Sequence, residues 1–346
     1  MFRKLAGRHE VLILAIIVVL SLVIGAINPN FFGVANAFAL IRSATVMGVF
    51  SLGALIVLAS GGIDVSFPAI AVAAMYTTTE LLVNWGYQGD SMLVPFALAA
   101  FLGLAMGLVN AFFIARFKLP TFIVTLGTLS LFRGATLFFV GSNYYNAREL
   151  PPAIRNFSAA SVVTVQAGRG TTSLHPTIFI LIALAIIVWL LLRYTMLGRA
   201  IYAMGGDREA AERAGFNITG TQIIIYSIAG VIAGIGGMIH GAMYRQANPF
   251  ALVGFEMEVL AAVVLGGASI AGGRGTVIGA LLGVILITVV QNSLILLGIP
   301  SDWQRVVVGV LILVGAGIPL LRARLTERRI AERRRLEARA ARSGAA

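Results

Sequence analysis

Residues 11–27 read Val11-Leu12-Ile13-Leu14-Ala15-Ile16-Ile17-Val18-Val19-Leu20-Ser21-Leu22-Val23-Ile24-Gly25-Ala26-Ile27. The run carries no charge, and as a helix it would extend roughly 26 Å, close to the ~30 Å hydrocarbon core of a bilayer. A basic stretch, residues 3–8, precedes it, as in a signal peptide. Asn28-Pro29-Asn30 follows it, however, where a signal peptide has a small-residue cleavage site. We therefore expect an uncleaved membrane anchor.

The whole chain shares this character. Of its 346 residues, 59% are apolar and 12% are charged, whereas a soluble domain carries about 25% charged residues. Such a composition excludes a soluble globular, disordered or collagenous protein. The chain has no cysteine, which excludes a disulfide framework and a thiol nucleophile, and its three histidines offer little for metal binding.

Further apolar runs of similar length predict an all-α polytopic membrane protein with about ten transmembrane helices. The candidate spans are residues 11–27, 37–59, 67–85, 92–115, 119–141, 176–194, 221–244, 254–270, 276–298 and 304–322. We expect one transmembrane domain, residues 1–322, followed by a basic tail, residues 323–346. Gly61-Gly62 and Pro68 indicate a broken or partly re-entrant helix within residues 54–72.

The basic residues predict the orientation. With the N-terminus inside, most of the 26 Lys and Arg residues fall on the inner side, as the positive-inside rule requires. Ten spans then place both termini in the cytoplasm. Of the two long connections, residues 142–175 face outward and residues 195–220 face inward.

The chain also contains a weak internal repeat. The stretch Val57 to Gly62 is echoed by the stretch Val264 to Gly267. The two halves are offset by five spans, an odd number, so they would be inverted relative to each other in the membrane. Inverted repeats are typical of transporters.

The inner loop contains a short helix with its own termination signals. Asp207 is a favourable N-cap, Glu209 and Arg213 are spaced i,i+4, and Gly215 is a helix terminator. A solvated linker helix would have the same sequence pattern. A self-capped helix between two spans, however, favours a docking site for a cytoplasmic partner. The predicted contact residues are Gly206, Asp207, Arg208, Glu209, Ala210, Ala211, Glu212, Arg213, Ala214 and Gly215.

This loop resembles the coupling helix of permease subunits of ATP-binding-cassette (ABC) importers for ribose, xylose, related simple sugars and autoinducer-2. Further stretches agree in the same order along the chain: Ser60 to Ser66, Leu119 to Leu129, Arg133-Gly134, Leu265 to Gly275, and Trp303-Gln304. One departure is Phe67-Pro68, where the family has a Val-Gly-like pair. Branched-chain amino-acid permeases are more distant relatives of similar architecture.

The resemblance implies a multi-pass protein of the bacterial cytoplasmic membrane. It implies a second permease subunit, identical or not, two cytoplasmic ATPase subunits that use the ATP, and a periplasmic or extracellular sugar-binding protein. The chain itself is expected to be no enzyme and to need no cofactor. Its residues agree, because they contain no phosphate-binding GxxxxGK[ST] loop.

Polar residues inside spans are costly and are therefore functional candidates. An uncharged sugar needs hydroxyl and amide groups along its pathway, although the same groups also join helices by hydrogen bonds. Arg133, about halfway along its span, needs a carboxylate, a carbonyl or a wet cavity. The candidate pathway residues are Asp64, Asn110, Thr121, Thr125, Thr128, Arg133 and Asn292.

Other functions compete with this one. An ion-coupled secondary transporter would need an essential membrane carboxylate, for which Asp64 and Glu256 are the candidates. A non-transporting scaffold is a third class. The basic tail is expected to bind anionic lipid and not nucleic acid, at about 1 kcal/mol per basic residue near the bilayer surface.

Overall fold

The computed structural model describes residues 2–167 and 170–300, and residues 303, 306, 307, 309, 310 and 313 beyond them. The chain forms two compact units, residues 1–299 and 300–346, and the fold below is that of the first. Most of the predicted span 304–322 and all of the predicted tail 323–346 lie outside the described residues.

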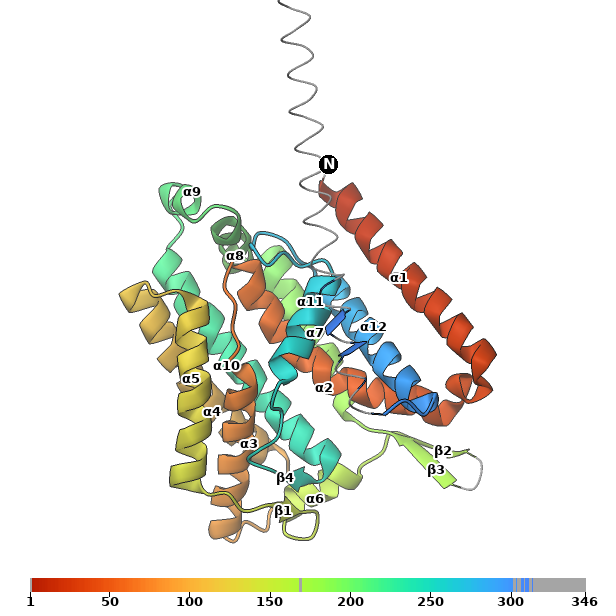
Figure 1. The fold of residues 1–346 in the computed structure, drawn as a ribbon. Coiled ribbons are helices and arrows are strands. Elements are labelled where there is room, and N and C mark those ends of the chain that lie inside the picture. The colour runs from red at the N-terminus through yellow and green to blue at the C-terminus, as the bar shows by residue number, and fades with distance from the viewer. Residues whose placement is uncertain are drawn as a thin grey trace, which may run out of the picture. The chain divides into compact units, whose positions relative to one another are not determined.

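Helices dominate the first unit (Figure 1). They are α1 (Phe2–Ile27), η1 (Pro29–Phe32), α2 (Val34–Ala59), α3 (Phe67–Asn84), α4 (Leu93–Ala111), η2 (Phe112–Arg116), α5 (Thr121–Ala135), η3 (Thr136–Val140), α6 (Pro152–Ala159), α7 (Thr177–Tyr194), α8 (Met196–Gly206), α9 (Arg208–Arg213), α10 (Ile218–Tyr244), α11 (Phe255–Leu265) and α12 (Val277–Leu296). Among the described residues, seven helices are long and apolar enough to cross a membrane: α1, α2, α4 with η2, α5 with η3, α7, α10 and α12. The prediction of an all-α polytopic membrane protein is confirmed.

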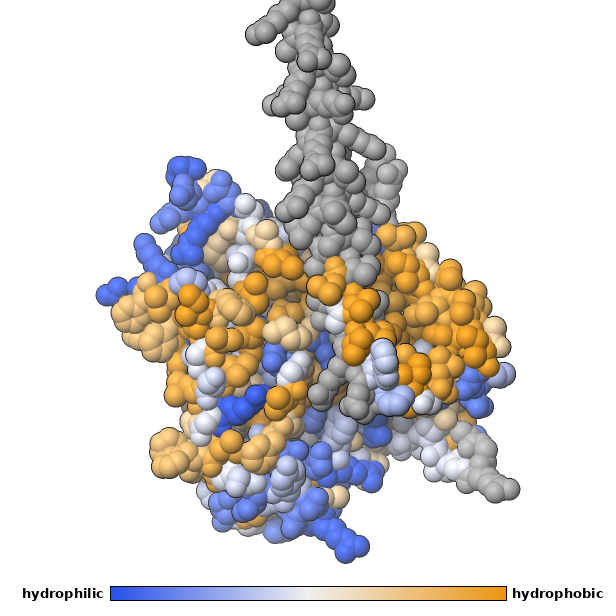
Figure 2. All heavy atoms as spheres, viewed as in Figure 1, coloured by the Kyte–Doolittle hydropathy of each residue, from blue (hydrophilic) through white to orange (hydrophobic). Residues whose placement is uncertain are grey.

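The surface is arranged as a bilayer requires. Figure 2 shows apolar side chains over α1 and over α4 and α5, with hydrophilic residues gathered near α9 and at the opposite end of the bundle. Large apolar side chains such as Val19 and Phe138 are 60% and 81% exposed on this surface. Lipid, not water, is the environment in which such exposure carries no cost.

The centre of the bundle consists of α2, α3 and α10, with α4 packed closely on α10. A Cβ atom at Gly103 would fall on the carbonyl oxygen of Gly230, and one at Gly234 would fall on that of Ala99. These glycines allow the close approach of the two helices, because any larger residue would separate α4 from α10.

The predicted span 254–270 is wrong as a continuous helix. Helix α11 has 11 residues and is therefore about 16 Å long, half of the ~30 Å hydrocarbon core. It ends where Gly266 and Gly267 follow, and Gly267 has a φ of 96°, a left-handed conformation that stops the helix. Helix α2 ends in a similar way before Gly61, whose φ is 84°. The two stretches that echo each other in sequence thus share a local shape.

The predicted outer loop, residues 142–175, is more ordered than its sequence indicates. It contains α6 and two strands, β2 (Val163–Ala167) and β3 (Gly170–Leu174), which form an antiparallel hairpin. Strand β1 (Tyr145–Asn146) pairs with β4 (Gln246–Ala247) after α10. Figure 1 shows α6 at the end of the bundle opposite to α9, as two loops on opposite sides of a membrane require.

Candidate functional site

Three side-chain caps in succession shape the loop between α7 and α10. Thr195 accepts a hydrogen bond from the backbone N–H of Gly198 at the start of α8, 3.0 Å away. Asp207 accepts from Ala210 N at 2.9 Å and begins α9, and Asn217 accepts from Gly220 N at 2.8 Å and begins α10. Gly215, with a φ of 88°, ends the turn after α9. The predicted helix and both of its termination signals are present, and α8 precedes it as an additional helix that the sequence analysis did not predict.

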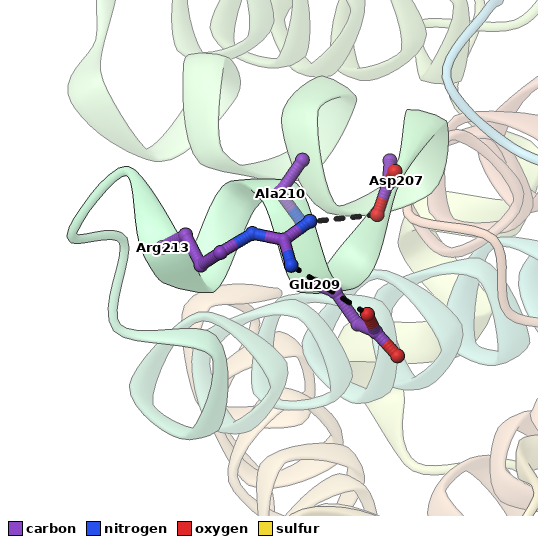
Figure 3. Close-up of polar contacts among 4 residues, drawn as sticks. All are labelled: Asp207, Glu209, Ala210 and Arg213. Atoms are coloured by element: carbon purple, nitrogen blue, oxygen red, sulfur yellow. Dashed lines mark hydrogen bonds and ion pairs between the residues drawn. The ribbon is translucent and has the colours of Figure 1, made fainter.

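Helix α9 projects from the end of the bundle, and its charged side chains face outward (Figures 1 and 3). Of the ten predicted contact residues, nine are exposed. Arg213 and Glu209 approach to 3.9 Å, but both side chains are more than 70% exposed, so this pair stabilises little. Arg208, in contrast, donates to Gln222 Oε1 of α10 at 3.4 Å, so the charges available to a partner are chiefly those of Glu209, Glu212 and Arg213.

Ala211 is the exception, and its burial contradicts its prediction as a contact residue for a partner. Its side chain is only 4% exposed, because it packs against the protein's own residues. Its carbonyl oxygen also accepts a hydrogen bond from Phe216 N at 3.1 Å, which closes the end of α9. Ala211 therefore holds α9 in place, and the surface available to a partner is formed by its neighbours.

A buried polar network joins three parts of the bundle. Asp64, in the segment between α2 and α3, accepts hydrogen bonds from the N–H and Oγ of Ser66, both at 2.7 Å. Asn110 of α4 donates to Ser66 Oγ at 2.8 Å, and Thr128 of α5 donates to Asn110 Oδ1 at 2.6 Å. Thr125 of α5 accepts from Val65 N and donates to the carbonyl oxygen of Ile63.

Four of the predicted pathway residues, Asp64, Asn110, Thr125 and Thr128, lie in this network, and each is at most 5% exposed. A fifth, Thr121, accepts a hydrogen bond from Tyr226 Oη of α10 at 3.0 Å. The cavity beside Asp64 measures about 10 Å³ and holds roughly one water molecule. Among the described residues, these side chains are closely packed, and their hydrogen bonds connect the start of α3 with α4 and α5.

The other two predicted pathway residues stand apart from this network. Arg133 has two buried nitrogen atoms, Nε and Nη2, without a hydrogen-bond partner in the described part of the chain. The buried Oδ1 of Asn292 in α12 also has no hydrogen-bond partner among the described residues. Buried polar groups of this kind are costly unless another conformation or a ligand satisfies them. In this respect, Arg133 and Asn292 differ from the residues of the network, whose side chains are hydrogen-bonded.

Sequence reasoning missed Ser66 and Tyr226 as candidate residues. Ser66 is the centre of the network, because its hydroxyl joins Asp64 to Asn110. A serine two residues after Asp64 and before Pro68 is a local signal for a turn at a helix start. Tyr226 had no such signal, since only the packing of α10 brings it to Thr121.

The candidates for ion coupling are separated in the structure. Asp64 belongs to the network, whereas Glu256 lies in the first turn of α11, and its buried Oε2 has no hydrogen-bond partner among the residues that the structure describes. In the described part of the chain, no three His, Cys, Asp or Glu side chains come together as metal ligands would.

Comparison with known proteins places the chain among transport proteins. The ribose import permease protein of Escherichia coli K12 is 33% identical over 304 residues, which cover 86% of this chain and 89% of that protein. The ribose import permease protein of Bacillus subtilis is also 33% identical and covers the same share of this chain and 88% of its own length. The autoinducer 2 import system permease protein of E. coli K12 is 30% identical over 90% of this chain and 87% of that protein. No solved structure matches the chain.

The family described as the permease component of branched-chain amino acid transport systems matches residues 36–316. This range includes α2 to α12, the polar network and α9. The chain therefore belongs to this family of membrane permeases.

Proposed function

We propose that this chain is the membrane-spanning subunit of an ABC importer that moves a simple sugar or a related polyol into a bacterial cell. The observation that carries the proposal is the 33% identity to ribose import permeases over 86% of the chain. The similarity to an autoinducer 2 permease supports the same class of small polar cargo.

In this proposal, the end of the bundle with α9 faces the cytoplasm, and two ATPase subunits bind there. The nine exposed residues of 206–215 form the docking surface. A second permease subunit completes the pathway, and an external sugar-binding protein delivers the cargo near α6. ATP binding and hydrolysis in the partner then drive alternating access.

The Asp64 network has a defined part in this mechanism. It ties α3, α4 and α5 together in the closed conformation, through hydrogen bonds between neutral groups and one carboxylate. Opening a pathway beside α5 requires some of these bonds to exchange with the hydroxyl groups of a sugar. Exchange of one hydrogen bond for another costs little, which suits a pathway that must bind its cargo weakly.

The test is transport of labelled ribose in proteoliposomes that contain this chain together with an ABC ATPase and a sugar-binding protein. We expect uptake to require ATP on the side of the membrane where the ATPase subunits are bound. Uptake should persist when an ionophore removes ion gradients. Uptake that stops with the ionophore and ignores ATP would show an ion-coupled transporter instead. Because the family is described by branched-chain amino acids, labelled leucine is the second cargo to test; uptake of leucine but not ribose would refute the sugar assignment.

A further inference from the structure

Backbone segments from three distant parts of the chain meet at the end of the bundle that carries α9. We call this contact the glycine junction: residues 59–61 at the end of α2, residues 205–206 at the end of α8, and residues 272–273 in the turn after α11. Its direct bond is donated by Gly273 N to the carbonyl oxygen of Ala59, at 2.9 Å. Figure 1 shows α8 beside the loop between α11 and α12.

At Gly205 and Gly272, the junction has no room for side chains. A Cβ atom at Gly205 would fall on the Ala59 carbonyl oxygen and lie 2.5 Å from Gly273 N, the two atoms that share the hydrogen bond. A Cβ atom at Gly272 would lie 2.6 Å from the Gly205 carbonyl oxygen and 2.7 Å from Gly61 Cα. Backbone therefore touches backbone, with no rotatable side chain between the three segments.

On one side, the junction is continuous with α9. Only Asp207 separates α8 from α9, and it is bonded to both helices. Its N–H donates to the Ala203 carbonyl oxygen of α8, and its carbonyl oxygen accepts from Ala211 N of α9, each at 3.0 Å. A displacement of α9 is thus transmitted to Gly205 through two short helices that are joined by Asp207 alone.

On the other side, the junction is continuous with the buried network. Ala59 is the last residue of α2, and five residues further along the chain Asp64 begins the network. The turn after α11 is fixed separately: Tyr202 Oη of α8 donates to the Gly275 carbonyl oxygen at 2.8 Å, and Thr276 Oγ1 donates to Glu10 Oε1 of α1 at 2.6 Å. Displacement of α8 must therefore move the end of α2 and this turn together.

We propose that Gly205 is the positioning residue through which movement of α9 reaches the segment before Asp64 and the turn after α11. This inference rests on the proposed docking of an ATPase at α9. Closely packed elements shift as units between discrete arrangements, so direct backbone contact transmits a small displacement that flexible side chains would absorb. Gly205 then determines how much cargo moves for each ATP hydrolysed, and not whether the ATPase binds.

The chain offers a matched pair of variants for the test. Gly205→Ala adds a methyl group inside the junction, whereas Gly127→Ala adds the same group on α5, outside the junction and the docking surface, where nothing lies within 4 Å. Both variants are made in the complete importer, with its ATPase and binding protein. ATPase retention, ATP hydrolysis and ribose uptake are measured on the same proteoliposomes.

We expect Gly205→Ala to retain the ATPase but to move about tenfold less ribose per ATP hydrolysed, a usual size for coupling between two sites. Gly127→Ala should match the wild type. A role limited to stability would lower uptake and hydrolysis in proportion and leave their ratio unchanged, and that result would overturn the inference.

If Gly205→Ala does not assemble, Tyr202→Phe decides the question, since it removes the hydroxyl bond to Gly275 without adding volume. A lower ratio of uptake to hydrolysis supports the junction, and an unchanged ratio refutes it. If the wild-type chain itself retains no ATPase, the proposed docking at α9 is what fails.

Discussion

Asn110 Nδ2 donates a 2.8 Å hydrogen bond to Ser66 Oγ across 44 residues of sequence, inside the membrane-spanning part of the chain. The same hydroxyl donates to Asp64 Oδ1 at 2.7 Å. One serine thus satisfies a carboxylate and an amide that are both almost fully buried. Because lipid offers no replacement partners, this pair fixes how α4 packs against the start of α3.

Ser66→Ala removes that shared hydroxyl and leaves Asn110 Nδ2 without the bond. We expect a loss of about 1–3 kcal/mol of stability, the usual cost of an unsatisfied buried polar group. Thermal unfolding of the purified protein in detergent measures it. Ser60→Ala is the control, because Ser60 Oγ bonds only to the carbonyl oxygen of Val57 in its own helix. Equal melting temperatures for the two variants would contradict the network's role.

Asp207→Ala should loosen α9. Its side chain is the N-cap that accepts from Ala210 N, and loss of such a cap costs about 0.5–2 kcal/mol of local helix stability. Hydrogen exchange of the amides of residues 208–213 should become faster. Asp207→Asn should exchange as slowly as the wild type, since asparagine caps helices equally well. Fast exchange in both variants would mean that the charge matters more than the cap.

Substitutions at two neighbouring alanines distinguish an effect on ATPase docking from an effect on folding. Ala210→Glu places a carboxylate on the exposed third position of α9, where it favours the helix, so the protein should stay folded but bind the ATPase less well. Ala211→Glu buries the same charge against the protein's own residues and should lower the yield of folded protein. Co-purification of the ATPase, compared at equal amounts of folded protein, distinguishes them. Normal ATPase binding by Ala210→Glu would identify α9 as a mere linker.

The proposed orientation can be tested with single cysteines, because the native chain contains none. Arg148→Cys lies in the loop that contains α6, and Arg208→Cys begins α9. In intact cells, a thiol reagent that cannot cross membranes should label position 148 and leave position 208 unlabelled until the membrane is opened. The reverse pattern would invert the orientation and place α9 outside the cell.

Acid should weaken the fold around α6. His175 Nδ1 accepts from Thr177 N at 3.3 Å, so the proton of the neutral ring is on Nε2, which donates to the Phe157 carbonyl oxygen at 2.9 Å. Burial is the main cause that lowers the pKa of His175 below its ordinary 6.5, with smaller contributions from Arg42 and Arg245, while the bond to Phe157 opposes the shift.

The folded state therefore favours neutral His175, and the unfolded state binds the proton more readily. The stabilisation is complete above pH 6.5 and is lost as the pH falls from 6.5 through the lower pKa of the folded state. The melting temperature should fall over this range in the wild type and fall less in His175→Gln. The same pH dependence in both proteins would exclude His175 as its source.

The sequence by itself determined that this is a polytopic helical membrane protein, because apolar runs as long as a bilayer is thick have no other stable environment. It also determined α9, since Asp207 and Gly215 terminate the helix through contacts with residues only a few positions away. Local rules suffice where the interacting groups are close along the chain.

Only the tertiary structure decided which candidate residues act together. The bonds that join Ser66 to Asn110 and Gly273 to Ala59 connect residues far apart in sequence, and no local pattern encodes them. The same holds for Ala211, whose burial depends on what α9 packs against, and for α11, where apolar composition predicted a full span but two glycines ended the helix at half that length. Hydropathy records how much each segment prefers lipid over water, whereas helix ends and contacts depend on backbone conformation and on which surfaces meet after folding.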